Sequence, residues 1–134
     1  MTYAARQASA VSDVVDPPNP HAVANSADMV DALRNLRLWA GQPSLRRLRQ
    51  LGGTTRDSAG RSVDLLPEAT ASYVLRGLRR PRAEFVRAFV YACMRFRGRS
   101  EVDIAAQQEI WHGAWLKVAS ANGFSWPEIP SRNP

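Results

Sequence analysis

Apolar residues recur at helical spacing along most of the chain. Met29, Leu33, Leu36 and Ala40 follow one another at intervals of four, three and four residues, which places them on one face of a helix. The same kind of spacing predicts five helices, over residues 27–40, 44–51, 67–77, 81–95 and 100–122. No stretch alternates apolar and polar residues as a half-buried strand does. We therefore expect an all-α fold.

Capping residues support these boundaries. Ser26 and Ser44 each precede a predicted helix, where a hydroxyl oxygen can accept an unpaired N–H of the first turn. Pro67 suits the first position of the third helix because its missing N–H would have no partner there. Gly77 suits a left-handed cap at the end of that helix. The polar stretch 54–66 is longer than most connections between helices, and we expect a loop.

The predicted helices form one domain between two extended segments. The run Asp16-Pro17-Pro18-Asn19-Pro20 disfavours helix, so we expect residues 1–26 to be a flexible, proline-rich leader. The five-helix domain occupies residues 27–122, and residues 123–134 follow as an extended C-terminal tail. Trp126 stands in this tail beside two prolines, and we expect it to dock either on the domain or on a partner.

The helix predicted over residues 81–95 has the most hydrophobic face and should lie at the centre of the core. Its apolar stripe consists of Phe85, Ala88, Phe89, Ala92 and Cys93. Because Cys93 is the only cysteine, it cannot form an internal disulfide, and we expect a buried apolar residue in a reducing compartment. The chain has no apolar run of eighteen residues and no secretory signal, which favours a cytoplasmic protein without a membrane partner.

Positive charge is concentrated in the middle of the chain. Fifteen of the eighteen cationic residues, all arginines, lie between Ala27 and Arg99, where only six acidic residues oppose them. The flanking segments carry a small negative net charge. A compact field of this sign attracts polyanions, above all nucleic acid. The alternative is a solvated helix surface in a proteome in which arginine is the common cation.

Residues suited to catalysis or metal binding are not grouped. There is no Gly-rich phosphate loop, no cysteine pair and no nucleophile motif. His21 and His112 have no cysteine or carboxylate at ligand spacing. We expect neither an enzyme nor a metal site, and no cofactor.

The order of the second and third helices fits a helix-turn-helix pair. In such a pair the first helix lies against the phosphate backbone and the second enters the major groove. The helix over residues 67–77 has a small, polar outward face, whose predicted base-facing residues are Ala69, Thr70, Ser72, Tyr73 and Arg76. The predicted phosphate contacts are Ser44, Arg46, Arg47, Arg49, Arg56, Arg61, Arg79, Arg80 and Arg82. Because this face has no Gln or Asn, we expect specificity either to depend on Arg76, Ser72, Thr70 and DNA shape or to be weak.

Several stretches resemble a known family. Residues 30–36 and 41–48, then 66–77, and then the proline-opened, Phe- and Val-rich stretch 80–93 are similar to the lambda-repressor-like (xenobiotic-response-element type) helix-turn-helix domains of actinobacteria. Trp111 and Trp115 also suit the fifth helix of that family. The resemblance covers about residues 27–120. It implies sequence-specific binding of double-stranded DNA, transcriptional regulation and a nucleoid-associated location, with the recognition helix over residues 67–77.

Other functions stay open. The same fold could serve as an adaptor that binds protein and not DNA, with an apolar surface supplied by Trp39, Trp126 and the C-terminal helix. RNA binding and an unrecognised enzyme are weaker alternatives. One expected partner is a second copy of the chain, because many operators are palindromic. The other is a protein bound through the Trp-containing C-terminal segment. Arginines that share one face with the third helix would favour DNA, whereas scattered arginines and an exposed Trp surface would favour the adaptor.

Overall fold

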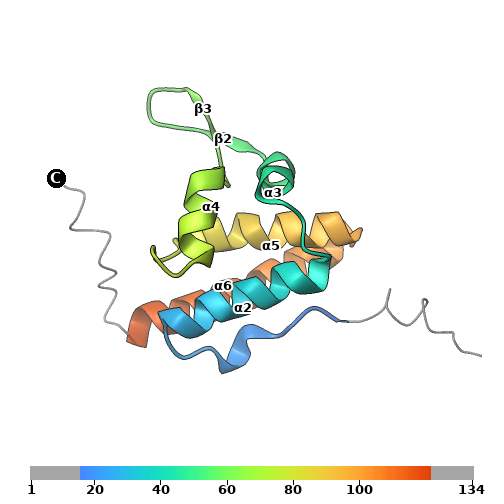
Figure 1. The fold of residues 1–134 in the computed structure, drawn as a ribbon, viewed down its shortest axis with the longest axis vertical. Helices are drawn as coiled ribbons and strands as arrows, with labels where there is room; N and C mark the ends of the chain where they lie inside the picture. The colour runs from blue at the N-terminus through green and yellow to red at the C-terminus, as the bar shows by residue number, and fades with distance from the viewer. Residues whose placement is uncertain (1–15, 122–134) are drawn as a thin grey trace, which may run out of the picture.

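The computed structural model describes residues 16–121, whose arrangement is shown in Figure 1. The helices are the short 3₁₀ helix η1 (Pro20–Ala22) and the α-helices α2 (Ser26–Ala40), α3 (Leu45–Gly52), α4 (Glu68–Leu75), α5 (Ala83–Arg97) and α6 (Glu101–Ala121). The strands are β2 (Thr54–Arg56) and β3 (Ser62–Asp64). The mainly helical fold class is therefore confirmed, and each predicted helix is present with ends within three residues of the predicted ones.

The stretch between α3 and α4 is a β-hairpin, so the expectation of an all-α chain with a plain loop here is wrong. β2 and β3 pair antiparallel, with Thr54 opposite Asp64. Asp57 holds the turn, because its Oδ1 accepts the N–H groups of Ala59 and Arg61, each at 2.9 Å. The strands are three residues long and all their residues are exposed or half-buried, so no alternation of apolar and polar residues marks them in the sequence.

The leader is ordered over its last part, which corrects the expectation of flexibility up to residue 26. Pro20 and Val23 are buried, and Val23 belongs to the hydrophobic core. The Lys117 ammonium on α6 donates to the His21 carbonyl at 2.6 Å. Two isolated buried residues leave no periodic pattern, which is why the sequence did not indicate this packing. Residues 1–15 and 122–134, including Trp126 and the predicted tail, lie outside the described residues.

The predicted caps are present at the start of α3 and after the end of α4, but not at the start of α2. The Ser44 hydroxyl accepts a backbone N–H of the first turn of α3 at 3.0 Å. Gly77 follows α4 with a φ of 77°, the left-handed conformation that glycine adopts at low cost. The cap of α2 is Asn25 rather than Ser26, with its Oδ1 accepting the Asp28 N–H at 2.8 Å. Asn is as good a cap as Ser, and here it begins the helix one residue earlier.

α5 lies at the centre of the core, as the sequence predicts. It packs against α2, α3 and α6. Its apolar stripe is buried and consists of Phe85, Ala88, Phe89, Ala92 and Cys93. The Phe85 and Phe89 rings stack with their centroids 5.7 Å apart, and Trp111 of α6 is also fully buried. Of the helices formed by residues 16–121, none is both long enough and apolar enough to cross a membrane.

α4 occupies a more peripheral position. It packs on α2 and α3, and the hairpin projects outward between α3 and α4, at the top of Figure 1. The helix predicted to recognise DNA is therefore positioned by its two neighbours and lies at the edge of the core.

We expect Phe89→Ala to lower the free energy of unfolding by about 3–5 kcal/mol, because the ring is fully buried and its removal leaves a cavity. Phe96→Ala is the matched control on the same helix, and its loss should be much smaller because Phe96 is 40% exposed. Chemical denaturation of both variants measures the difference. Equal losses would contradict the assignment of the core.

Candidate nucleic-acid interface

α4 has one buried and one open face. Ala71, Val74 and Leu75 point into the core. The five predicted base-facing residues remain accessible: Ala69, Tyr73 and Arg76 are exposed, and Thr70 and Ser72 are half-buried. Except for Tyr73 and Arg76, these side chains are small, so another surface can approach the helix backbone closely.

Arg76 is held in place by two of its neighbours on this face. Its NH1 lies 3.3 Å from the Ser72 hydroxyl oxygen and donates to it. Its guanidinium also lies over the Tyr73 ring, 5.8 Å from the centroid. These contacts restrict the guanidinium without neutralising it, because neither partner is acidic.

Arg34 of α2 fixes the end of α4, an arrangement that the sequence did not predict. Its Nε donates to the Leu75 carbonyl at 2.6 Å, and its NH1 pairs with Asp31 at 3.0 Å. The carbonyls of a last helical turn have no partner within the helix, so a cation there both satisfies an acceptor and suits the helix dipole.

The arginines of α3 divide into exposed and paired residues. Arg46 and Arg47 are exposed near the capped start of the helix, and Arg47 donates to Gln50 at 3.3 Å. Arg46 makes no ion pair or hydrogen bond with another side chain within residues 16–121.

Arg49, in contrast, pairs with Glu68 at 3.0 Å and with Asp64 at 3.7 Å. It thus links α3 to the start of α4 and to β3, and two carboxylates already occupy its guanidinium. This side chain is a structural link, which differs from the phosphate contact predicted for it.

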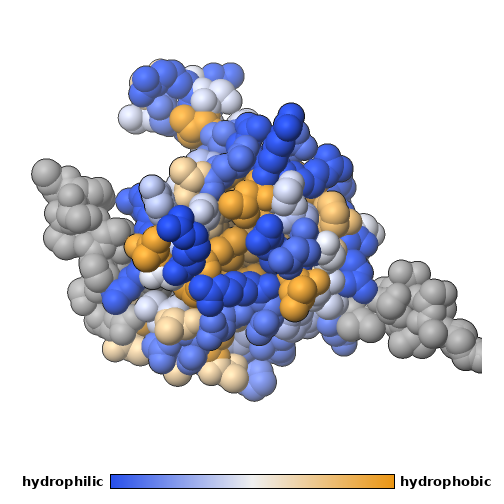
Figure 2. Space-filling view, in the orientation of Figure 1, coloured by the Kyte–Doolittle hydropathy of each residue, from blue (hydrophilic) through white to orange (hydrophobic). Residues whose placement is uncertain are grey.

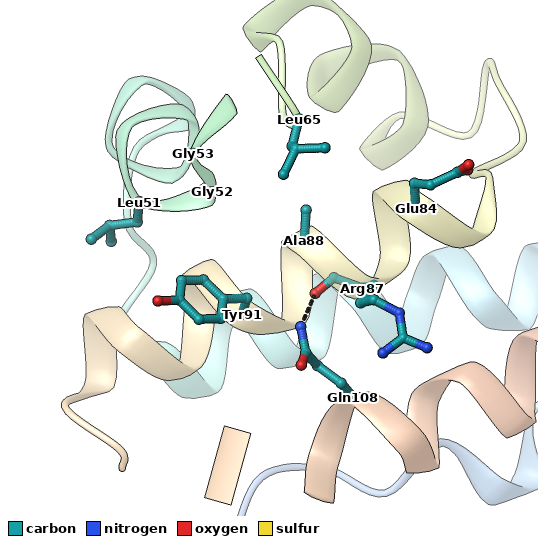
Figure 3. A pocket seen from close by; sticks show the side chains of 9 residues that line it. All are labelled: Leu51, Gly52, Gly53, Leu65, Glu84, Arg87, Ala88, Tyr91 and Gln108. Atoms are coloured by element: carbon teal, nitrogen blue, oxygen red, sulfur yellow. Dashed lines mark hydrogen bonds between the residues drawn. The ribbon is translucent and has the colours of Figure 1, made fainter. Parts of the chain in front are cut away.

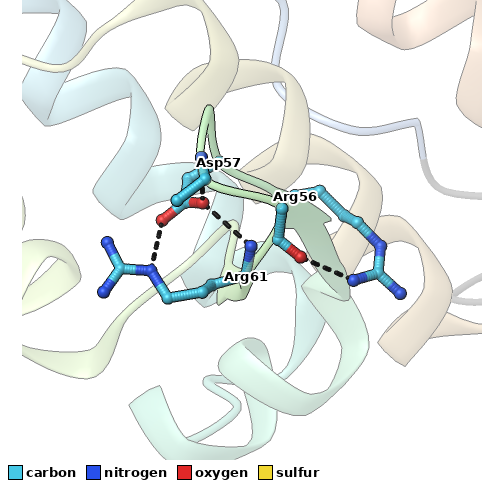
Figure 4. A network of polar contacts seen from close by, with 5 residues as sticks. Arg56, Asp57 and Arg61 are labelled. Carbon is cyan, nitrogen blue, oxygen red and sulfur yellow. Dashed lines mark hydrogen bonds and ion pairs between the residues drawn. The ribbon is translucent and has the colours of Figure 1, made fainter.

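The hairpin carries Arg56 and Arg61, both exposed and both engaged at its turn (Figure 4). The Nε of Arg61 pairs with Asp57 at 3.2 Å, and the NH1 of Arg56 donates to the Gly60 carbonyl at 2.7 Å. The hairpin is thus polar and well hydrogen-bonded, but Asp57 offsets part of its positive charge.

The linker between α4 and α5 brings the remaining predicted phosphate contacts to the far end of α4. Arg79 and Arg82 are exposed, and Arg80 is half-buried. Pro81 between them is buried, and its carbonyl accepts the Trp115 indole N–H at 3.0 Å. Among the described residues, no partner is found for the guanidinium groups of Arg79 and Arg82.

Other arginines of the basic stretch serve the fold itself. Arg37 donates from Nε to the Pro43 carbonyl at 2.8 Å, and Arg97 donates to the Trp39 carbonyl. The guanidinium groups of Arg97 and Arg99 lie 4.6 and 5.3 Å from the Trp39 ring centroid. Trp39 is therefore half-buried beneath two cations and is not an open apolar surface.

The surface around the helix pair is mostly hydrophilic. On the face shown in Figure 2, hydrophilic residues make up most of the hairpin and of the surface around α3, and hydrophobic residues lie between α3 and α4. Such a mixture of polar rim and apolar centre suits an interface.

Potential metal ligands are not clustered in the part of the chain that the structure describes. No cluster of three or more His, Cys, Asp or Glu side chains there could hold a metal ion. Burial raises the pKa of the Cys93 thiol well above its ordinary value, so that it stays protonated.

Comparisons of the chain with protein-family models, with curated proteins and with solved structures found no match. The resemblance to helix-turn-helix domains therefore stays a prediction.

We expect Gly52→Ala to lower the free energy of unfolding by about 1–3 kcal/mol, because the added Cβ would lie 2.7 Å from the Leu66 Cδ1 and 2.9 Å from its Cγ. Leu66 is fully buried, so a shift of its side chain would disturb the packing between α3 and the start of α4.

Gly113→Ala is the control, since a Cβ there meets nothing within 4 Å and should stabilise the middle of α6 by up to about 1 kcal/mol. Denaturant titrations compare the two variants. A neutral Gly52→Ala would show that Leu66 can repack.

Proposed function

We propose that this protein binds double-stranded DNA in a sequence-specific manner and regulates transcription, with α4 as its recognition helix. The observation that carries the proposal is the open face of α4, on which Arg76 is oriented by Tyr73 and Ser72. This helix stands at the edge of the fold and is preceded by a capped helix with exposed arginines.

The side chains on the open face of α4 are suited to contacts in the major groove. A helix enters that groove when its outward side chains are short enough for base edges to be reached. Ala69, Thr70 and Ser72 meet this requirement, and Arg76 can donate to the O6 and N7 atoms of a guanine. An oriented guanidinium loses less conformational entropy on binding, which favours Arg76 as the main specificity residue.

Four arginines are suited to phosphate contacts: Arg46 and Arg47 at the start of α3, and Arg79 and Arg82 beyond the end of α4. All four are exposed, and none is paired with a carboxylate among the described residues. For each phosphate that they neutralise, the logarithm of the binding constant should fall by about 0.9 for a tenfold rise in salt concentration. The paired residues Arg49 and Arg61 are the weaker candidates from the predicted set.

A protein-binding role on the same fold is the second candidate, and one observation favours it. α6 exposes apolar side chains, with Val102 at 79%, Ile110 at 43% and Leu116 at 41% exposure. Exposed apolar residues on one helix are compatible with a protein partner. Trp39 supports this candidate less, because Arg97 and Arg99 lie over its ring.

We expect the full chain to retard a random-sequence duplex at low salt and to release it as salt is raised. Arg46→Ala should weaken binding to every sequence alike and lower the salt slope by about one, because it removes one phosphate contact. Arg95→Ala is the matched control, since Arg95 is exposed but is paired with Glu101 of α6 at 3.4 Å and is not among the predicted DNA contacts. Absence of binding at low salt would exclude the DNA proposal and favour the protein-binding role.

We expect Arg76→Ala to act differently from Arg46→Ala. Sites selected from a random duplex pool by the unsubstituted chain should lose about 1–3 kcal/mol of binding free energy, because a base contact is lost. Binding to random duplex should change little. Quantitative gel retardation on both kinds of duplex measures the difference, and equal losses on both would remove Arg76 from the specificity role.

A further inference from the structure

A pocket of about 460 Å³ opens between α3, the base of the hairpin and α5, with one residue of α6 at its edge (Figure 3). Gly52 and Gly53 contribute only backbone to it, so no side chain fills this part of the space. The volume lies within the range of sites that hold a small molecule. The other walls are mainly apolar and are formed by Leu51, Leu65, Ala88 and the ring of Tyr91.

The end of α3 brings unpaired carbonyl groups to this pocket. α3 ends at Gly52, and in the described part of the chain no N–H donates to the carbonyl of Leu51 or Gly52. A helix C-terminus of this kind has a partial negative charge and favours a hydrogen-bond donor or a cation. The basic residue of the last turn, Arg49, is already bound to the carboxylates of Asp64 and Glu68.

Glu84 adds a full negative charge at the other end of the pocket, across from Gly52 and Gly53 in Figure 3. Its carboxylate is exposed at the start of α5 and makes no ion pair or hydrogen bond with another side chain among the described residues. The positive charge of Arg87 on the same rim is offset by the Glu109 carboxylate, 3.5 Å away. The rim is therefore acidic, although the net charge of the chain is +6.

Most polar groups around the pocket accept hydrogen bonds. Gln108 of α6 uses its Nε2 to donate to the Arg87 carbonyl at 3.1 Å, which leaves its Oε1 as an acceptor (Figure 3). The Glu84 carboxylate and the last carbonyls of α3 are further acceptors, whereas the Arg87 guanidinium is engaged with Glu109. A ligand that donates hydrogen bonds therefore fits this rim better than one that accepts them.

We propose that this pocket binds a small organic cation, an arylalkylamine whose aromatic ring carries an N–H or O–H group. The ring packs between Leu51, Leu65 and the ring of Tyr91, where apolar burial and aromatic contact stabilise it. Its N–H or O–H donates to the carbonyls at the end of α3, and the ammonium pairs with Glu84.

The spacing of residues along α5 sets the length of the ligand. Glu84, Ala88 and Tyr91 lie at positions i, i+4 and i+7, and thus on one face of the helix. Measured along the helix axis from Glu84, Ala88 is about 6 Å away and Tyr91 about 10 Å. A ring at the level of Ala88 and Tyr91 leaves a gap to Glu84 that an alkyl chain of about two or three carbons spans.

Titration of the full chain with tryptamine tests the site, because this indole carries a ring N–H and an alkylamine that is protonated at neutral pH. We expect saturable changes in the amide NMR signals of Gly52, Gly53, Leu65 and Ala88. Tryptophol, which has a hydroxyl in place of the amine, should bind about two- to fivefold more weakly, as expected for loss of an exposed ion pair. Indolepropionate, which has a carboxylate there, should bind more weakly still. The form of tryptamine that is methylated on the ring nitrogen should also lose affinity, because it cannot donate to α3.

Variants of the chain separate charge from packing. Glu84→Gln keeps the size of the side chain and should lower the affinity for tryptamine to about that for tryptophol, with tryptophol binding unchanged. Asp31→Asn is the matched control, since it makes the same change at an exposed carboxylate of α2, which lines no part of the pocket. Tyr91→Leu should weaken all these ligands alike through loss of the ring contact, and the chain should stay folded because Tyr91 is only half-buried.

Three results would overturn the proposal. The first is an absence of saturable shifts at the pocket amides, and the second is binding of tryptophol or indolepropionate as tight as that of tryptamine. The third is an unchanged affinity for tryptamine in Glu84→Gln. None of these measurements uses DNA, so they are independent of the proposed function.

Discussion

Burial of α5 against three other helices is the constraint on which the remaining structure depends. α2, α3 and α6 each pack on it, and its stripe from Phe85 to Cys93 has almost no exposed surface. Dense packing of this kind leaves little freedom in the relative positions of the four helices. α4 is outside this arrangement and takes its position from α2 and α3, through the Arg34 bond to the Leu75 carbonyl and the fit of Leu66 against Gly52.

The arginines illustrate how one residue type is divided among different tasks. In the sequence they form a single basic stretch. In the folded protein they differ in the groups that their guanidiniums contact. Arg34, Arg37 and Arg97 donate to backbone carbonyls and join segments distant in sequence. Arg49 and Arg61 pair with carboxylates. The exposed arginines without a carboxylate partner on α3 and in the linker after α4 are Arg46, Arg47, Arg79 and Arg82, so the net charge overstates the number of cations that can serve an interface.

Much of the fold could be predicted from the sequence because it follows from local periodicity. The spacing of residues such as Leu33, Leu36 and Phe89 predicts the helices, and the Ser44 cap predicts the start of α3. The hairpin could not be found, since its short strands have no buried face. The contacts of Arg34 and Arg49 could not be predicted from the sequence either, because their partners Leu75 and Glu68 lie 41 and 19 residues away in the chain. Periodicity shows which residues face inward and gives no information on which distant groups meet.

The hairpin between α3 and α4 is closed at its base, where the Leu65 N–H donates to the Gly53 carbonyl at 3.0 Å. The chain therefore leaves the domain after α3 and returns to it before α4 at adjacent points, whatever the length of the hairpin between them. Loop closure costs rise only slowly with length, so residues can be gained or lost at the turn with little effect on the angle between the helices. The turn of the hairpin is therefore a suitable insertion site, where a new binding loop or a tag could be placed while the flanking helices keep their geometry.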